Sequence, residues 1–262
     1  YPNTQAWNRG SMMARSLRPD GPFEVFNWSK ENPKATVGVL GFDPAVFVDD
    51  DGRVYGYWGF DKSYAAELDP VTMATVKEGT EIINLIPART EDTTFRFFEA
   101  SSIRKIEDKY VFVYSRWTNE GEFGLPSTNF TLAYAYSDNP LGPFEFKDVF
   151  MDESPNDCWT NHHSFVEYKG QWYLFYHHND YSPHFDKNRS ARIDKVTFNE
   201  DGTINKVIPT LRGVGPVAAS SKVQPDRYSS IDGAVIAYVD TTDYFKGWKT
   251  VFAKAGDSVR FD

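Results

Sequence analysis

The sequence predicts an all-β fold in which similar sheets repeat around an axis, as they do in a β-propeller. One layout of strand, turn and aromatic-rich strand occurs three times, opening at Asp43, Glu99 and His162. The openings are 56 residues apart (43 to 99) and 63 residues apart (99 to 162), which is typical of four-stranded sheets that repeat in a radial array. Helical periodicity is nearly absent, and this second observation favours the same fold class.

The first copy places expected strands at 43–48 and 53–58 on either side of a turn. We expect that turn, Asp49-Asp50-Asp51-Gly52, to be a solvated hairpin turn, because the run lacks the downstream glutamate of a calcium-binding loop. The two later copies follow the same order, with expected strands at 99–104, 110–114, 162–167 and 171–176.

Three blades are expected around these strand pairs, at residues 41–80, 97–148 and 160–207. Residues 1–24 are expected to form the outer part of one more blade, because Ser16 to Glu24 match Ser137 to Glu145. The predicted domains are a partial propeller at 1–222 and the start of a β-sandwich at 223–262, where the strand pattern changes character.

The composition excludes several classes of partner. A net charge of −9 and a pI near 5.1, without a basic cluster, argue against nucleic acid as a partner. No apolar run is long enough for a transmembrane helix, so no membrane span is expected. The single cysteine excludes a multi-cysteine metal site.

The three repeat openings carry the candidate chemistry. The first strand of each propeller blade lines the central channel, so Asp43, Glu99 and His162 are expected to face one shared cavity. Two carboxylates and an imidazole among aromatic side chains indicate acid/base chemistry on a neutral, hydroxyl-rich ligand.

Four motifs resemble glycoside hydrolase family 43, a family of five-bladed β-propeller arabinofuranosidases, xylosidases and arabinanases. The motifs are Asp43-Pro44-Ala45-Val46-Phe47-Val48, Phe98-Glu99-Ala100-Ser101-Ser102-Ile103, Asn161-His162-His163-Ser164 and Asn188-Arg189-Ser190-Ala191-Arg192. The resemblance covers residues 1–215 and implies an incomplete propeller, with the first blade and part of the second outside this chain. The segment from residue 223 looks similar to the opening strands of a jelly-roll carbohydrate-binding module.

The resemblance also implies roles for individual residues. Glu99 matches the family's general acid, Asp43 the aspartate that orients that acid, and Arg189 an arginine that contacts the sugar. The family's general base is an aspartate that would precede Tyr1, so it is expected outside this chain. An intact enzyme of this type inverts the anomeric centre with two carboxyl groups and a water.

The remaining candidates have competing interpretations. Phe42, Trp117 and Trp159 either floor a sugar subsite or pack between blades, and Arg189 either binds sugar or forms an inter-blade salt bridge. His162 either hydrogen-bonds within the channel, as a structural or substrate-contacting residue, or holds a hydrated Ca²⁺ ion; no cofactor is otherwise required.

The sequence thus predicts a glycosidase that acts on side chains of plant cell-wall polysaccharides such as arabinoxylan or arabinan. It most resembles an inverting exo-α-L-arabinofuranosidase or a β-xylosidase, with a secreted or periplasmic location preferred over a cytoplasmic one. The alternatives are a non-catalytic carbohydrate-binding propeller and a propeller scaffold for protein contacts.

Overall fold

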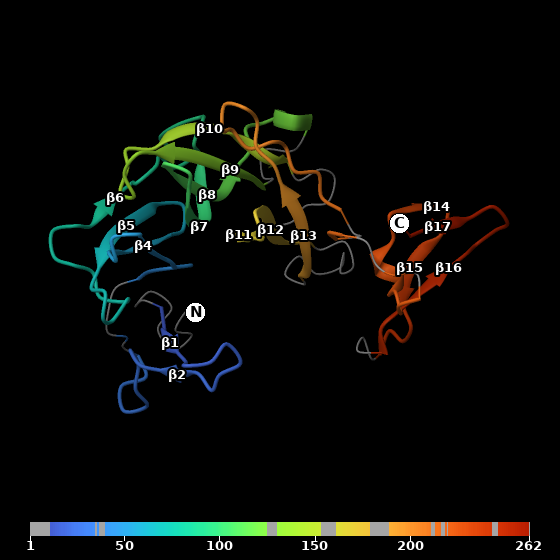
Figure 1. The fold of residues 1–262 in the computed structure, drawn as a ribbon, viewed down its shortest axis with the longest axis horizontal. Helices are drawn as coiled ribbons and strands as arrows, with labels where there is room; N and C mark the ends of the chain where they lie inside the picture. The colour runs from blue at the N-terminus through green and yellow to red at the C-terminus, as the bar shows by residue number, and fades with distance from the viewer. Residues whose placement is uncertain are drawn as a thin grey trace. The chain divides into compact units, whose positions relative to one another are not determined.

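The computed structural model describes residues 11–34, 36, 40–124, 130–152, 161–178, 189–210, 213–215, 218, 220–242 and 246–261. The chain divides into two compact units, Tyr1–His163 and Ser164–Asp262, and each is described by itself (Figure 1). The sequence-predicted domain limits, 1–222 and 223–262, stay a prediction.

The first unit contains two four-stranded antiparallel sheets and a small hairpin. The hairpin pairs β1 (Ala14–Arg15) with β2 (Glu24–Val25). The first sheet has the order β3 (Ala45–Val48), β4 (Val54–Gly59), β5 (Ser63–Leu68) and β6 (Ile82–Ile83). The second consists of β7 (Phe97–Ile106), β8 (Lys109–Trp117), β9 (Phe130–Ser137) and β10 (Glu145–Asp152), with a 3₁₀ turn at Glu122–Gly124.

The two sheets match the blades expected at 41–80 and 97–148, and each opens with the predicted strand pair, β3 with β4 and β7 with β8. Aromatic residues of β4, β7 and β8 form a common core, in which Tyr57, Phe97 and Phe112 are fully buried. The Tyr57 hydroxyl donates to the Pro140 carbonyl at 2.7 Å, so a hydrogen bond also joins the two sheets.

The turn between β3 and β4 departs from the solvated turn that we expected. Asp50 and Asp51 are exposed, but Asp49 is buried, with 7% of its surface accessible. Tyr110 at the start of β8 donates its hydroxyl hydrogen to Asp49 Oδ2 at 2.6 Å. Asp49 is therefore an internal link between the two sheets, because its partner comes from the neighbouring blade.

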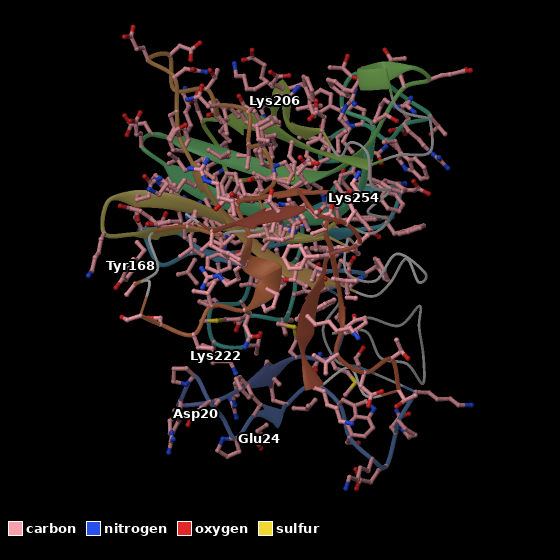
Figure 2. All side chains as sticks on the ribbon, turned by 90° about the vertical axis from the view of Figure 1, so that its right-hand side faces the viewer. Asp20, Glu24, Tyr168, Lys206, Lys222 and Lys254 are labelled. Atoms are coloured by element: carbon pink, nitrogen blue, oxygen red, sulfur yellow. The ribbon has the colours of Figure 1, made fainter. Side chains whose placement is uncertain are left out.

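The second unit is also built from β-strands. Strand β11 (His163–Tyr168), whose first residue closes the first unit, pairs with β12 (Gln171–His178), which pairs with β13 (Ser190–Val196). The exposed Tyr168 ends β11 before the turn to β12 (Figure 2). Two further antiparallel pairs follow a 3₁₀ turn at Pro225–Arg227: β14 (Ser230–Asp232) with β17 (Ser258–Arg260), and β15 (Val235–Tyr238) with β16 (Trp248–Val251).

The predicted all-β class is confirmed, since the described segments contain strands and only two short 3₁₀ turns. Among those segments, none of the helices has the length and apolar character needed to cross a bilayer. The assignment of the last strands to a β-sandwich module stays a prediction.

Candidate active site

Asp43 lies in the segment that leads into β3, and the local backbone fixes its direction. Its φ of 49° is in the left-handed region, which aspartate tolerates better than most residues. The preceding Phe42 accepts a hydrogen bond through its carbonyl from the amide of Gly59, at the end of β4. This hydrogen bond fixes the segment to the sheet, so Asp43 is held just before the first residue of β3.

Glu99 lies near the start of β7, where the ladder with β8 is irregular. Glu99 is opposite Ser115, and the next regular pair is Ser102 with Val113, so the strand contains a bulge. Ala100 inside this bulge has a φ of 60°. A bulge redirects the side chains around it, and it is often found next to active sites. The repeat predicted that Glu99 opens the blade, but nothing in the sequence predicted the bulge.

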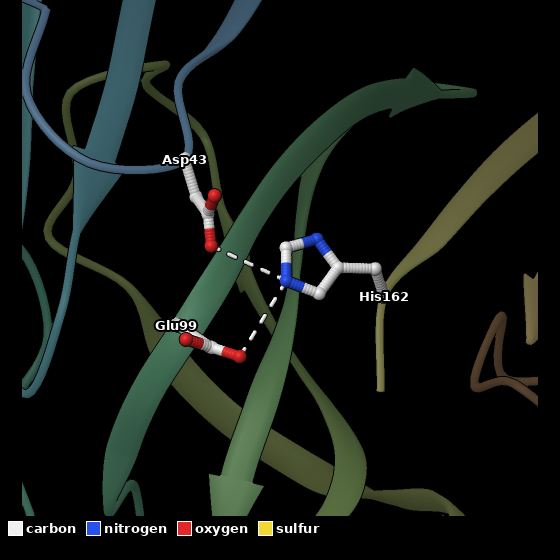
Figure 3. A group of neighbouring side chains, drawn as sticks. All are labelled: Asp43, Glu99 and His162. Atoms are coloured by element: carbon white, nitrogen blue, oxygen red, sulfur yellow. Dashed lines mark ion pairs between the residues drawn. The ribbon is translucent and has the colours of Figure 1, made fainter. Parts of the chain in front are cut away.

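The three predicted residues meet in one group within the first unit (Figure 3). His162 Nε2 lies 3.2 Å from Asp43 Oδ2 and 3.5 Å from Glu99 Oε1. One ligating atom from each residue lies within 4.8 Å of the other two. The imidazole therefore stands between the two carboxylates.

The two carboxylates differ in how far they are buried. Glu99 is 2% exposed, whereas the Asp43 side chain is 22% exposed. Glu99 Oε1 has no hydrogen-bond partner among the described residues, so its approach to His162 is a charge contact. A buried carboxylate oxygen normally has a partner, because leaving it unpaired costs about 1–3 kcal/mol or more. This exception makes Glu99 Oε1 the candidate reactive atom of the group.

The carboxylates determine the charge of His162. Burial acts to lower the pKa of the imidazole, but the interactions with Asp43 and then Glu99 outweigh it and raise the pKa to about 9. At neutral pH His162 is therefore an imidazolium. Its positive charge offsets the repulsion between the two carboxylates.

The same three residues fit a cation site in spacing and donor type. Two carboxylate oxygens and one imidazole nitrogen are close enough to share one ion. An imidazolium has no free lone pair, so His162 can ligate a cation only after it loses the proton. Binding of a cation and protonation of His162 are therefore mutually exclusive.

Two of the predicted aromatic residues belong to a chain of rings beside Glu99. Phe42 packs edge-on against Phe60, with ring centroids 5.5 Å apart, and Phe60 packs against Phe98 at 5.1 Å. Trp117 packs against Phe98 at 4.8 Å. Trp117 therefore contacts the ring of Phe98, which precedes Glu99 in the chain, and Phe42 reaches that ring only through Phe60. These ring contacts also fit the competing interpretation, in which the aromatic residues pack between blades.

Sequence reasoning missed two polar residues at this ring chain. Trp117 Nε1 donates to Asp61 Oδ1 at 3.1 Å, and the guanidinium of Arg89 lies 3.9 Å from the Trp117 ring centroid. Both lie in loops between repeated strands, where the repeat gives no register. Their side chains are 40% exposed, so they border solvent beside the buried acid.

For the other two predicted residues, Trp159 and Arg189, a place in this group stays a prediction. Trp159 lies outside the described residues. Arg189 directly precedes β13 in the second unit and is exposed, and its part in the site stays a prediction.

Comparison with known proteins places this geometry in a family. A model of glycosyl hydrolases family 43 matches residues 1–204. The chain belongs to this family. Family 43 solved structures resemble it with TM-scores such as 0.59, which confirms the predicted propeller fold class. The resemblance seen in the four motifs is likewise confirmed.

Three relatives in family 43 illustrate the likeness. A β-xylosidase from Xylanibacter ruminicola is 32% identical, and the match covers 72% of this chain and 63% of that protein. An arabinoxylan arabinofuranohydrolase from Paenibacillus polymyxa is 31% identical, covering 78% of this chain and 34% of that protein. The third is a solved structure with a TM-score of 0.59, of a β-xylosidase/α-arabinofuranosidase from a compost microbial metagenome in complex with xylotriose, in a calcium-free form. It is 29% identical, and the match covers 74% of this chain and 64% of that one. The chain thus spans about two thirds or less of these relatives.

Proposed function

We propose that the protein is an inverting glycoside hydrolase that removes terminal α-L-arabinofuranosyl or β-D-xylosyl units from plant cell-wall polysaccharides. The observation that carries the proposal is the meeting of Asp43, Glu99 and His162, with Glu99 Oε1 buried and without a hydrogen-bond partner. Membership of family 43 and the activities named for the xylosidase and arabinofuranohydrolase relatives support it.

Glu99 is the proposed general acid. Glu99 must be protonated to act, and the proton that His162 Nε2 holds beside it is the proposed source. As the bond from the anomeric carbon to the leaving oxygen breaks, the Glu99 carboxyl gives this proton to that oxygen, which departs as a neutral hydroxyl. Water attacks the opposite face of the sugar and loses a proton to a general base. That base is predicted to be an aspartate outside this chain, so the chain supplies the acid half of the reaction.

Asp43 and His162 are proposed to position the acid. His162 Nε2 donates to Asp43 and lies against Glu99, so the imidazolium holds both carboxylates near one point. Asp43, the more exposed of the two, stays able to contact a bound sugar hydroxyl. Phe42 and Trp117 are proposed to floor the sugar subsite by ring stacking, with Trp159 and Arg189 as further substrate contacts.

A hydrated Ca²⁺ ion is the proposed alternative occupant of the position beside His162. Neutral His162 would hold it, with waters completing the oxygen-rich shell that Ca²⁺ prefers and Glu99 left free to carry its proton. The bound ion would supply the positive charge that the imidazolium otherwise supplies next to Glu99. The calcium-free form named for the solved relative supports the idea that calcium is relevant in such proteins.

The proposed substrates are polymers of plant cell walls, which lie outside cells. A secreted or periplasmic location is therefore proposed for the protein, and the segment from residue 223 is proposed to be the start of a carbohydrate-binding module.

The test is an assay of the full-length protein on arabinoxylan, arabinan and the 4-nitrophenyl glycosides of α-L-arabinofuranose and β-D-xylose. We expect release of the free pentose, with the inverted anomer as the first product in a proton NMR time course. Retention of the anomeric configuration would contradict the inverting mechanism. Binding of arabinoxylan without turnover of any substrate would instead favour the non-catalytic carbohydrate-binding propeller.

A further inference from the structure

A pocket lies on the β7–β10 sheet, where β8 begins, β9 ends and β10 begins. Its volume is about 640 Å³, within the range of about 300–1,000 Å³ that is usual for small-molecule sites. Strands β8, β9 and β10, the turn from β9 to β10 and one preceding loop line it, through Phe95, Lys109, Tyr136, Ser137, Asp138, Pro143, Phe144, Glu145, Phe146 and Lys147.

The pocket residue Lys109 and the group around Glu99 lie at opposite ends of β8. Glu99 is opposite Ser115, near the end of β8, whereas the pocket residue Lys109 begins that strand. Six residues of extended strand separate these two points, a distance of about 20 Å. A ligand at the end of the pocket formed by Lys109 therefore leaves Glu99 free to act, although Phe95 at its other side is only four residues before Glu99 in the chain.

The aromatic walls of the pocket are fixed by the core. Phe144 packs against the fully buried Phe112 at 5.4 Å, and Phe146 packs against Phe95 at 5.7 Å. Tyr136 packs against the buried Tyr134 at 5.3 Å and is itself partly buried, with Lys147 Nζ 5.8 Å from its ring centroid. These rings need little ordering on binding, so they offer rigid faces to a ligand.

The charged residues of the pocket neutralise one another. Lys109 Nζ lies 2.5 Å from Asp138 Oδ1, and Lys147 Nζ lies 2.8 Å from Glu145 Oε1. Two cations thus face two carboxylates, so the lining gives no net attraction for an anion or a cation. Rigid rings beside polar groups without net charge suit a flat, neutral molecule rich in hydroxyls.

We propose that this pocket is a second carbohydrate-binding site, which holds a neutral sugar unit of the polysaccharide whose terminal residues are cleaved at Glu99. The inference rests on the proposed function for the identity of the polymer. The Tyr136 ring, beside Lys147 Nζ, forms the aromatic wall that the sugar contacts, and the paired Lys147 and Glu145 provide hydrogen bonds to the sugar hydroxyls. Holding the polymer at a distance from the acid raises the local concentration of cleavable ends.

The main experiment compares Tyr136→Ala, Tyr136→Phe and Tyr168→Ala in the full-length protein. Tyr168 is the matched control, because it is an exposed tyrosine that lies outside the pocket (Figure 2). Affinity electrophoresis in gels containing soluble arabinoxylan measures binding. We expect Tyr136→Ala to weaken retention about 10-fold, while Tyr136→Phe and Tyr168→Ala stay within about 2-fold of the unaltered protein.

Short substrates separate this inference from the proposed function. We expect kcat/KM for a 4-nitrophenyl glycoside to be unchanged in Tyr136→Ala, since the ligand reaches only the site at Glu99. If the unaltered protein cleaves no glycoside, the proposed function fails. If it cleaves glycosides and Tyr136→Ala binds arabinoxylan as tightly as Tyr168→Ala does, the second site fails alone.

A measurement on the unaltered chain removes any dependence on the folding of the variants. Xylohexaose is expected to slow the acetylation of Lys109 and Lys147 by an amine reagent at least 3-fold, as read by mass spectrometry of peptides. Lys77, exposed and paired with Glu67 outside the pocket, is the internal control. Equal acetylation of all three lysines with and without xylohexaose would overturn the proposal.

Discussion

Two buried carboxylates in the first unit, Asp49 and Glu99, have opposite surroundings. Asp49 accepts hydrogen bonds from the Tyr110 hydroxyl at 2.6 Å and from the Asp50 amide at 2.9 Å, and Lys105 lies 3.8 Å away. Glu99 Oε1 has only the charge contact with His162, at 3.5 Å, and no hydrogen bond among the described residues.

The difference separates a structural carboxylate from a functional one. The bonds to Asp49 join β3–β4 to β8, and burial together with the Asp49 hydrogen bond raises the pKa of Tyr110 to about 12. Glu99 makes no comparable link between blades. Its unpaired oxygen is destabilising for the fold, and such a cost persists where a ligand or a reaction uses the group.

The largest expected effect is on catalysis, from Glu99→Gln. The amide has the same shape but cannot donate the catalytic proton, so we expect kcat/KM on natural oligosaccharides to fall about 10²- to 10⁴-fold. The melting temperature should stay within a few degrees, because no inter-blade hydrogen bond is lost. Steady-state kinetics and calorimetry check both parts. A large loss of stability with little loss of activity would reverse the roles assigned to Glu99 and Asp49.

The next largest effect is on stability, from Asp49→Ala. The buried Tyr110 hydroxyl and the Asp50 amide lose their acceptor, so the free energy of unfolding should fall by about 2–4 kcal/mol. Asp51→Ala is the control: Asp51 lies in the same turn but pairs with Arg53 on the surface, where loss costs about 0.5 kcal/mol. Urea unfolding measures both. Similar losses for the two variants would mean that burial of Asp49 does not matter.

The contrast between these carboxylates also shows what the sequence could predict. The repeat aligned Asp43, Glu99 and His162 because each opens a blade, and residues at equivalent positions of a radial array point to one axis. The same repeat did not reveal the partner of Asp49. That partner, Tyr110, is 61 positions away on the next blade, and three consecutive aspartates look like a solvated turn.

The local backbone geometry of the site could not be predicted from the sequence for a related reason. The bulge at Glu99 and the left-handed φ of Asp43 and Ala100 arise from how strands pair, and none of these residues is a glycine that would mark them. Arg89 and Asp61 were missed because loops between repeats have no fixed register. Side-chain roles that depend on the second unit, such as that of Arg189, stay predictions.

A smaller effect is expected in the pH dependence of stability, and it tests the charge of His162. The pKa of His162 is raised to about 9 in the folded protein, against about 6.5 when unfolded, so its stabilising contribution is complete below pH 6.5 and is lost as pH rises through 9. With allowance for its one-third exposed side chain, that contribution is about 1–2 kcal/mol. The gap in stability between the unaltered protein and His162→Gln should close between pH 6 and pH 10. A constant gap over that range would contradict the imidazolium.

Calcium gives a second test of the same residue. Because His162 must lose its proton to ligate a cation, binding of Ca²⁺ at pH 7.5 should release about one proton per ion. Calorimetry in two buffers with different ionisation enthalpies measures this number. Binding without proton release would place the ion away from His162, and His162→Gln provides the control.

The smallest expected effect concerns the rings beside the acid. Trp117→Phe keeps an aromatic ring but removes the 3.1 Å hydrogen bond to Asp61, so the free energy of unfolding should fall by about 1 kcal/mol. Asp61→Asn keeps an acceptor oxygen, so its loss of stability should be smaller than that of Trp117→Phe. If Trp117 forms the floor of a sugar subsite, KM rises in Trp117→Phe in addition to this loss of stability; an unchanged KM would assign Trp117 to packing alone.

The leaving-group dependence of Glu99→Gln tests the central claim most directly. Aryl glycosides whose phenols span several units of acidity are hydrolysed by the unaltered protein and by the variant, and log kcat/KM is plotted against the pKa of the leaving phenol. The account predicts a shallow slope for the unaltered protein and a steep negative slope for Glu99→Gln, since good leaving groups need no proton. Parallel slopes would contradict the assignment of Glu99 as the proton donor.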